Sequence, residues 1–363
     1  MRRFLIYGGI FFIFVISSCQ NLKNKYPIIG VKIYEHNGDL GDLFSEWERI
    51  GINLILASPD LAGKDNFMSL ARNHSMSVFL IVPTFYNAEV LDNDSSLYSI
   101  TREGERAVDD WVRFICPNKT QYRSSHIQYL KNLAAEIQPD GISLDFIRYF
   151  VYWEKVFPDQ IYNNFPQTCF DQDCLVKFLA EYRVTLPDTC YSVKEKADFV
   201  LFQYEKEWVE FKCNTIGGYV GEMVDALRSV DPEIKINFHA VPWKSNDFEG
   251  GIRSIAGQDL KLIAPFVDYI SPMCYHHMVI QSPDWVHEVV NDIALQAPDE
   301  KILPSIQVSK AYLETSISET EFRTALVESL QPPSDGVVFW SWEALEKSPE
   351  KVKIVRDYVE ENY

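Results

Sequence analysis

The chain has 363 residues and a formal net charge of -18 at pH 7. This charge argues against nucleic-acid and anionic-membrane partners, because phosphate binding needs clustered Lys and Arg. The length allows one large α/β domain, since barrels of that class often run to about 250 residues or more.

The first residues have the layout of a secretory signal. Arg2 and Arg3 precede an apolar run over 4–16, which is too short to span a membrane comfortably. Ser17 and Ser18 stand directly before Cys19 without an Ala-x-Ala site, and this arrangement resembles the bacterial lipobox. The resemblance implies cleavage before Cys19 and lipidation of its thiol; an uncleaved N-terminal anchor is the alternative.

This interpretation sets the expected organisation of the chain. Residues 1–18 are predicted to be a lipoprotein signal peptide, 19–27 a polar tether, and 28–363 the folded domain. We expect the protein to be lipid-anchored in the bacterial cell envelope, on its periplasmic face or at the cell surface.

Short apolar runs rich in β-branched residues alternate with helical patterns along the rest of the chain. Strands are predicted over 28–34, 52–58, 78–83, 141–146, 234–241, 269–275, 302–308 and 337–342. Helices are predicted over 40–50, 67–74, 122–137, 197–230, 259–266, 283–296, 319–330 and 349–361. Eight βα repeats predict an α/β fold of the (β/α)8 TIM-barrel type. A doubly wound sheet is the alternative, but neither Gly-x-Gly-x-x-Gly nor a phosphate loop follows the first strand.

Two connections are longer than ordinary loops. They cover 86–117, after the third strand, and 150–196, after the fourth. Both leave carboxyl ends of strands, the face that holds active sites in such barrels. Long structured loops there usually have functional roles, so we expect these insertions to form substrate walls.

The fourth strand carries the most informative residues. Alternation places Gly141, Ser143 and Asp145 on one face, so that two small side chains precede a carboxylate at the carboxyl end. In a parallel barrel this pattern predicts that the Asp145 carboxylate is a reactive group, with room left for it by the small residues below. The structural alternative is that Asp145 caps the next helix or pairs with Arg148.

Polar and aromatic side chains also follow other strands. Lys32 is predicted to point into the barrel, where an unpaired ammonium is costly, so Asp145 or Glu35 is its expected partner. The further candidates are Arg148, Tyr149, His239, Trp243, Tyr275, His276, Gln307, Trp340 and Trp342. Core packing is the alternative for Trp340 and Trp342. His276 and His277 are adjacent and cannot both face one metal from a strand.

The cysteines leave several arrangements open. Cys169 and Cys174 could form a disulfide, or one of them could pair with Cys190. A Cys-x4-Cys zinc half-site is the alternative, but no second tight pair or His pair accompanies it. Cys116 and Cys274 are predicted to be buried thiols. We therefore expect no metal.

The run Asp140-Gly141-Ile142-x-Leu144-Asp145-Phe146-Ile147-Arg148-Tyr149 resembles the fourth-strand motif of the family 10-like glycoside hydrolases, which are (β/α)8 barrels common among bacterial lipoproteins. The resemblance spans nearly the whole mature chain and implies an enzyme, or former enzyme, acting on glycans. Glycoside hydrolase family 18 is a more distant resemblance. Ile147 stands where that family has its acid Glu, so the mechanism of family 18 is not available here.

The resemblance implies cleavage of O-glycosidic bonds in an oligo- or polysaccharide by two carboxylates, without a cofactor. Asp145 is the first, assigned as nucleophile by analogy with retaining barrel glycosidases. Glu343 and Asp247 are the candidates for the second, with Glu35 and Glu154 behind them. The alternative is a carbohydrate-binding lipoprotein that kept the barrel and lost turnover.

Overall fold

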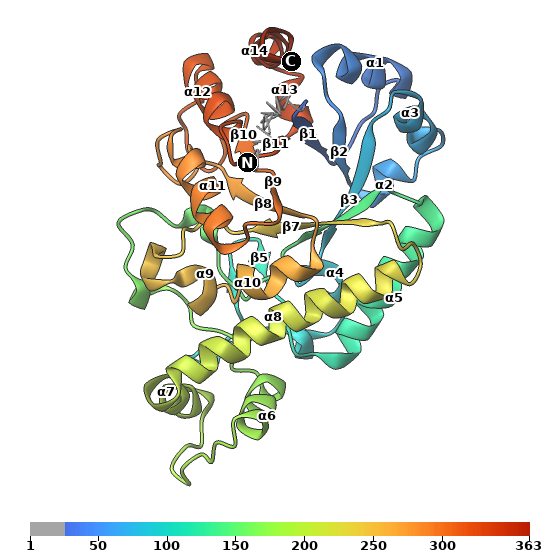
Figure 1. Cartoon of the computed structure of the whole chain (residues 1–363). Helices are drawn as coiled ribbons and strands as arrows, with labels where there is room; N and C mark the ends of the chain where they lie inside the picture. The colour runs from blue at the N-terminus through green and yellow to red at the C-terminus, as the bar shows by residue number, and fades with distance from the viewer. Residues whose placement is uncertain (1–25) are drawn as a thin grey trace, which may run out of the picture.

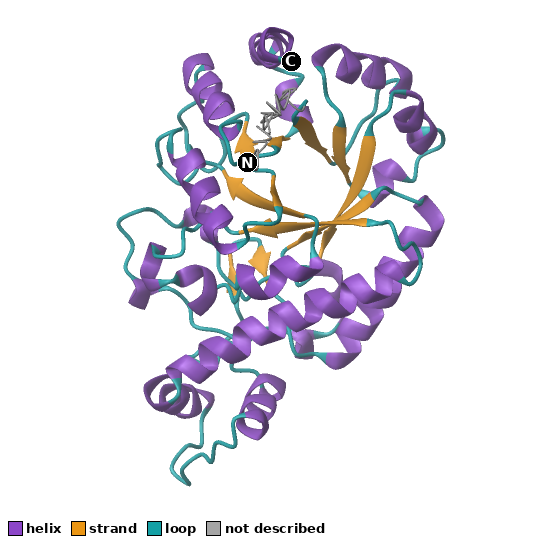
Figure 2. Ribbon diagram, viewed as in Figure 1, coloured by secondary structure: helices purple, strands orange, loops and turns teal. Residues whose placement is uncertain are grey.

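The computed structural model describes residues 26–363, and its parallel strands close into a barrel (Figures 1 and 2). The strands are β1 (Ile28–Ile33), β2 (Leu54–Ala57), β3 (Ser77–Pro83), β6 (Gly141–Asp145), β7 (Lys235–Ala240), β8 (Tyr269–Cys274), β9 (Lys301–Ile302), β10 (Ser305–Gln307) and β11 (Gly336–Trp340). Pairing of β11 with β1 and of β8 with β10 completes the ring. The predicted TIM barrel is confirmed.

The signal peptide, Cys19 and most of the predicted tether lie outside the described residues. The last tether residues, Tyr26 and Pro27, contact the barrel: the Asn53 side chain donates to the Pro27 carbonyl. No helix within 26–363 is long and apolar enough to cross a membrane.

Helices surround the sheet, as Figure 2 shows. They are α1 (Leu40–Ile50), α2 (Pro59–Ala62), α3 (Phe67–Asn73), α5 (Thr120–Ile137), α7 (Val193–Gln203), α8 (Glu205–Arg228), α9 (Gly251–Ser254), α10 (Leu260–Ile263), α11 (Trp285–Gln296), α12 (Glu319–Ser329), α13 (Trp342–Leu345) and α14 (Pro349–Asn362). Helix α1 has the predicted bounds because Asp39 caps its first turn and Gly51, in the left-handed conformation, ends it.

Two predicted elements are divided in the structure. The helix predicted over 197–230 is two helices, because Ser192 and Glu195 form a capping box that begins α7 earlier and Tyr204 interrupts the run. The strand predicted over 302–308 is broken into β9 and β10 around Pro304, which has no backbone N–H for the ladder.

The barrel interior has an apolar floor and a polar upper layer. Leu54, Leu56, Phe79, Ile81, Leu303 and Val338 form the floor. Gly141 leaves room for it, since a Cβ there would stand 2.7 Å from the Phe79 ring and from the Lys235 carbonyl oxygen. The upper layer contains the buried polar side chains of Lys32, Ser143, Asn237, His239, Ser271 and Ser305.

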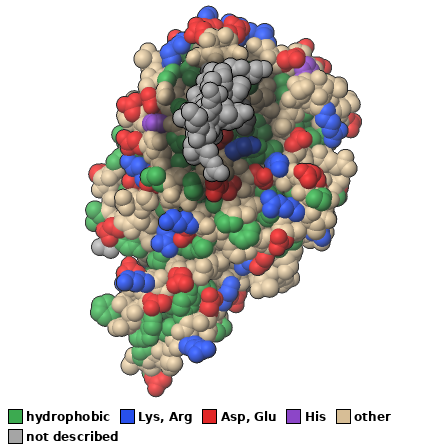
Figure 3. All heavy atoms as spheres, viewed as in Figure 1, with side chains coloured by type: hydrophobic (Ala, Val, Ile, Leu, Met, Phe, Trp, Pro, Cys, Tyr) green, Lys and Arg blue, Asp and Glu red, His purple; other side chains and the backbone are tan. Residues whose placement is uncertain are grey.

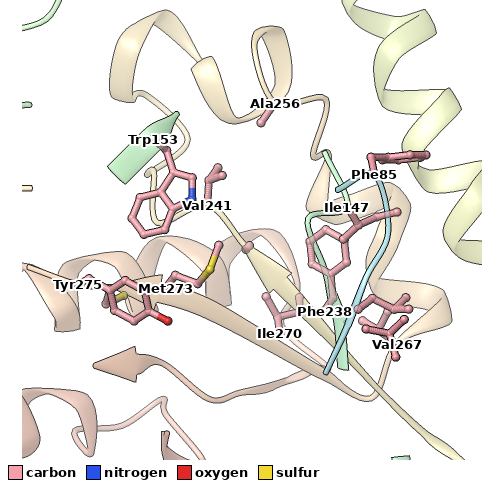
Figure 4. Packing of buried hydrophobic residues seen from close by; sticks show 14 of the residues in the cluster. Phe85, Ile147, Trp153, Phe238, Val241, Ala256, Val267, Ile270, Met273 and Tyr275 are labelled. Carbon is pink, nitrogen blue, oxygen red and sulfur yellow. The ribbon is translucent and has the colours of Figure 1, made fainter. Parts of the chain in front are cut away.

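The outward faces of the strands form the main hydrophobic core beneath the helices. Phe238 of β7 and Ile270 of β8 are register partners and pack near Val267 (Figure 4). This alternation of faces is why the inward polar residues could be predicted from the strand pattern. On the face drawn in Figure 3, Lys and Arg side chains lie scattered among Asp and Glu.

The two insertions carry their own short elements. The first contains α4 (Ala88–Asn93), a 3-10 turn over Ser95–Leu97, and a hairpin of β4 (Val108–Asp109) and β5 (Val112–Arg113). The second contains 3-10 turns over Trp153–Lys155 and Tyr162–Asn164, and α6 (Gln172–Glu181). Helices α6 and α7 project away from the barrel (Figure 1).

Candidate active site

A cavity of about 330 Å³ lies at the carboxyl ends of the barrel strands. This volume lies at the lower end of the range for small-molecule sites. Strand residues form its base and insertion residues its walls. The lining consists of Lys32, Tyr34, Pro83, Tyr86, Trp111, Asp145, Phe146, Arg148, Trp153, Glu154, Met273, Tyr275, Met278, Tyr312 and Trp340.

Asp145 ends β6 and is buried in this cavity. Its Oδ1 accepts a hydrogen bond from the Phe146 amide at 2.7 Å, and Phe146 has a left-handed φ of 49°. That conformation costs a non-glycine residue roughly 1–2 kcal/mol, so the turn that fixes the carboxylate is strained. Burial alone would raise the pKa of Asp145, but His239, Lys32, the Phe146 amide and Arg148 outweigh it and lower the pKa. Asp145 is therefore ionised at neutral pH.

A chain of hydrogen bonds supports Lys32 from below. Its Nζ donates to Tyr275 Oη at 3.1 Å and to His239 Nδ1 at 3.3 Å. An ammonium only donates, so Nδ1 accepts, and Nε2 of the neutral ring donates to Ser143 Oγ at 2.7 Å. Burial and the charge of Lys32 lower the pKa of His239 to about 3, which agrees with the neutral ring. Burial also lowers the pKa of Lys32 to about 8, despite the charge of Asp145.

Glu154 brings a second carboxyl group to the same cavity. It lies in the first 3-10 turn of the second insertion and is 8% exposed. Burial raises its pKa to about 7; Arg148 opposes this rise and the charge of Asp145 adds to it. Glu154 Oε2 is buried without a hydrogen-bond partner among the described residues. One cavity therefore holds an ionised carboxylate and a carboxyl group that is protonated up to about pH 7.

Arg148 interacts electrostatically with both acids. Burial lowers the pKa of Arg148, and the charges of Glu154 and Asp145 oppose that lowering. Its guanidinium is buried, 5.0 Å from the ring centres of both Phe114 and Phe146. The aromatic contacts hold the cation in place without neutralising it.

Aromatic side chains from separate segments form the walls. Trp111, from the β4–β5 turn, donates through Nε1 to Tyr312 Oη at 3.0 Å, and Tyr86 stacks on Phe146 at 4.8 Å. Tyr275, which follows β8, and Trp340, which ends β11, stack with their ring centres 4.4 Å apart. The ring centres of Trp153 and Tyr275 are 5.7 Å apart. Both side chains are labelled in Figure 4.

Five of the residues predicted from strand ends line this cavity: Lys32, Asp145, Arg148, Tyr275 and Trp340. His239 lies beneath the cavity and is connected to it by the hydrogen bond from Lys32. These six residues belong to or follow five strands, β1, β6, β7, β8 and β11, and barrel closure brings them together.

The two favoured candidates for the second carboxylate lie elsewhere. Glu343 is in α13, where its Oε1 accepts hydrogen bonds from the amides of Tyr34 and Glu35 at 2.7 and 3.1 Å. Glu35 is exposed and does not line the cavity. Asp247 lines a separate cavity with Trp243 and accepts a bond from the Lys244 amide.

The other predicted residues make structural contacts. Gln307 bonds the Met278 amide and the Ser309 carbonyl, and His276 approaches Glu321 at 3.1 Å. Tyr149 packs near the Lys212 ammonium of α8, and Trp342 packs edge-on against Trp47. None of these four lines the cavity that holds Asp145.

Sequence reasoning ranked Glu154 low and did not select Tyr86, Trp111, Trp153 or Tyr312. Their segments follow neither strand nor helix periodicity, so nothing in the pattern shows which side chains face inward. The available signal was the clustering of aromatic residues in insertions that leave the carboxyl face.

Comparisons with known proteins identify the fold. No family model matches the chain, and no curated protein matches its sequence. The PgaB (BpsB) glycoside hydrolase domain from Bordetella bronchiseptica superposes with a TM-score of 0.68 at 13% identity, over 92% of this chain and 99% of that one.

Two larger enzymes match part of their length. The β-galactosidase from the psychrophilic Marinomonas ef1 gives a TM-score of 0.66 at 12% identity, over 92% of this chain and 59% of that one. The α-L-fucosidase isoenzyme 2 from Paenibacillus thiaminolyticus gives 0.60 at 11%, over 93% and 49%. At these identities the comparisons establish a (β/α)8 barrel shared with glycoside hydrolases. Membership of the family 10-like group stays a prediction, and so does the more distant fold relation to family 18.

Proposed function

We propose that this chain is a glycoside hydrolase that cleaves O-glycosidic bonds with Asp145 and Glu154. The observation that carries the proposal is that two carboxyl groups line one cavity while their environments shift their pKa values in opposite directions. Such a division between an ionised and a protonated carboxyl is what glycosidic cleavage requires.

The environments assign the two roles. Asp145 is ionised and acts as the nucleophile that attacks the anomeric carbon. Glu154 is protonated and gives its proton to the leaving glycosidic oxygen, for which its unpartnered Oε2 is available. After glycosyl transfer, the ionised Glu154 takes a proton from the water that hydrolyses the intermediate.

The surrounding residues bind and orient the sugar. Tyr275, Trp340 and Trp111 offer ring faces or edges to it, and Arg148 and Lys32 supply hydrogen-bond donors. The names of the structural neighbours, a glycoside hydrolase domain, a β-galactosidase and an α-L-fucosidase, support a carbohydrate substrate. The anchoring lipid on Cys19 is part of the proposal and would hold the enzyme in the cell envelope.

The proposed pair differs from the pair favoured by the sequence. Glu343 accepts hydrogen bonds from the two backbone amides that follow β1, and it is not among the residues that line the cavity. Asp247 lines another cavity. We therefore assign the role of second carboxylate to Glu154 instead of Glu343 or Asp247.

The test compares Asp145→Asn and Glu154→Gln with wild type on aryl glycosides and on reducing-end release from a polysaccharide panel. Asp145→Asn should lower turnover by at least about a thousandfold, roughly 4 kcal/mol of transition-state stabilisation. Glu154→Gln should lower polysaccharide cleavage by about 10²–10⁴-fold. Its effect on nitrophenyl glycosides should be smaller, because that leaving group needs little protonation.

Glu136→Gln, an exposed carboxyl on α5, is the matched control and should behave as wild type. Melting temperatures are measured alongside, so that loss of fold is separated from loss of chemistry. A folded Asp145→Asn variant with normal turnover would remove Asp145 from the mechanism. A wild type that binds glycans in calorimetry without cleaving any would favour the carbohydrate-binding alternative.

A further inference from the structure

Three cysteines from separate positions in the two insertions meet in the protein interior. Cys116, Cys169 and Cys174 are fully buried, and their Sγ atoms all lie within 4.8 Å of one another. The Sγ atoms of Cys116 and Cys174 are 3.4 Å apart. Cys116 ends the first insertion, whereas the other two belong to the second. The proposed glycosidase chemistry uses none of them.

Hydrogen-bond donors point at two of the three sulfur atoms of the cluster. The Ile100 amide donates to Cys169 Sγ at 3.3 Å, and Asn118 Nδ2 donates to Cys174 Sγ at 3.1 Å. Hydrogen bonds to sulfur of this kind are a regular feature of thiolate metal ligands.

We propose that Cys116, Cys169 and Cys174 bind a thiophilic divalent cation of the Zn²⁺ class through three thiolates. Binding releases the thiol protons to solvent and involves no oxidation or reduction. The Asp171 carboxylate lies beside the cluster, with Oδ1 at 3.7 Å from Cys116 Sγ, although only the three sulfur atoms all lie within 4.8 Å of one another.

The spacing of the sulfur atoms suits such an ion. Tetrahedral coordination with Zn–S bonds of about 2.3 Å separates the sulfur atoms by roughly 3.8 Å. The cluster, with sulfur distances from 3.4 Å up to at most 4.8 Å, brackets that value. Three thiols cannot all pair with one another in disulfides, whereas one ion engages all three.

Nearby cations balance the remaining charge. Lys119 Nζ lies 3.0 Å from Asp171 Oδ1, and the buried ammonium of Lys212 interacts electrostatically with Cys213, Cys169 and Cys174. Three thiolates, one carboxylate and a divalent cation leave a net negative charge, which these two ammonium groups offset. No metal was expected from the sequence, because no second tight Cys pair or His pair accompanies Cys169 and Cys174; Cys116 lies 53 positions before Cys169 (residue 116 against 169).

The ion would connect the two insertions that form the walls of the active site. The first insertion carries Trp111 and the second carries Glu154. An ion bound to Cys116 of the first insertion and to Cys169 and Cys174 of the second would therefore fix the position of one wall relative to the other.

The experiment uses the full chain, produced with Zn²⁺ and with thiols protected by reductant from lysis onward. Metal analysis should find about one zinc ion per chain in wild type, and Co²⁺ loading should give thiolate-to-cobalt charge-transfer absorption. Serine replacement of Cys116, Cys169 or Cys174 should abolish both signals. Cys213→Ser and Cys274→Ser, two buried cysteines outside the cluster, are the matched controls and should retain them.

A measurement on the wild type covers the case in which the cluster variants do not fold. Removing the ion with a chelator should lower the melting temperature, and Zn²⁺ but not Mg²⁺ should restore it. Wild type without bound zinc, unchanged thermal stability after chelation, or a Cys116–Cys174 disulfide in thiol-blocked protein would each overturn the proposal. None of these readouts depends on glycan turnover, so their outcome is separate from that of the proposed function.

Discussion

Replacing Glu154 with glutamine tests the electrostatics of the site without knowledge of the substrate. In the folded protein the pKa of Glu154 is about 7, against an ordinary value of 4.5. The folded state therefore binds the Glu154 proton more tightly than the unfolded state does. The difference corresponds to roughly 3 kcal/mol, because one pKa unit is about 1.36 kcal/mol. Because the Glu154 side chain is only 8% exposed, solvent screening reduces this free-energy difference little.

The sign of the effect follows from linkage. The contribution of Glu154 to stability is fully present below about pH 4.5 and declines as the pH rises. It is lost once the pH passes about 7, where the folded protein holds a buried anion. Glutamine cannot ionise, so the variant should gain about 3 kcal/mol relative to wild type between these two pH values.

Urea unfolding of both proteins at several pH values from 4.5 to 8 measures this difference, and the titration of all other groups cancels in it. The exposed Glu136→Gln variant should show a flat difference and serves as the control. If the two curves for Glu154→Gln and wild type ran parallel, the assignment of a raised pKa would be refuted. In an activity assay, the alkaline limb of kcat/KM near pH 7 should disappear or move in Glu154→Gln.

Two further substitutions test the base of the barrel. Gly141→Ala should lower the free energy of unfolding by about 1–3 kcal/mol in urea titrations, because the new Cβ meets the Phe79 ring. Gly218→Ala in α8, where nothing lies within 4 Å of the added Cβ, should be neutral or stabilising, and equal effects at both glycines would contradict the packing argument. Lys32→Met should raise the pKa of Asp145, since Lys32 helps to lower it, and should move the acid limb of kcat/KM to higher pH; an unmoved limb would exclude this coupling.

The strand framework could be predicted because alternation and βα repetition depend only on local order. The position of Asp145 followed from the same alternation, and barrel closure then placed Lys32, Tyr275 and Trp340 around it. The eighth strand was predicted to run to 342, but it ends at Trp340 and Glu343 lies in α13. Because the strand ends earlier than predicted, the Glu343 carboxylate does not stand at a strand end and instead bonds the backbone amides that follow β1.

Glu154 and the cysteine cluster could not be placed in the same way. Each depends on how the insertions fold over the barrel, which is decided by contacts between distant segments. Cys116 and Cys174 are 58 positions apart, and no periodic pattern relates them. Burial of Glu154, which raises its pKa, is likewise a property of the assembled walls and not of its neighbours in sequence.

The separation of base and walls has an evolutionary consequence. The residues at the base belong to or directly follow strands that are paired on both sides with neighbouring strands of the ring. The walls come largely from two contiguous stretches, 86–117 and 150–196, which join the ring only at their ends. A single insertion, deletion or recombination event can therefore exchange a wall while leaving Asp145 and its support intact. Under the proposed function, selection for a new glycan would act on these segments as replaceable parts, provided that an acid equivalent to Glu154 is kept.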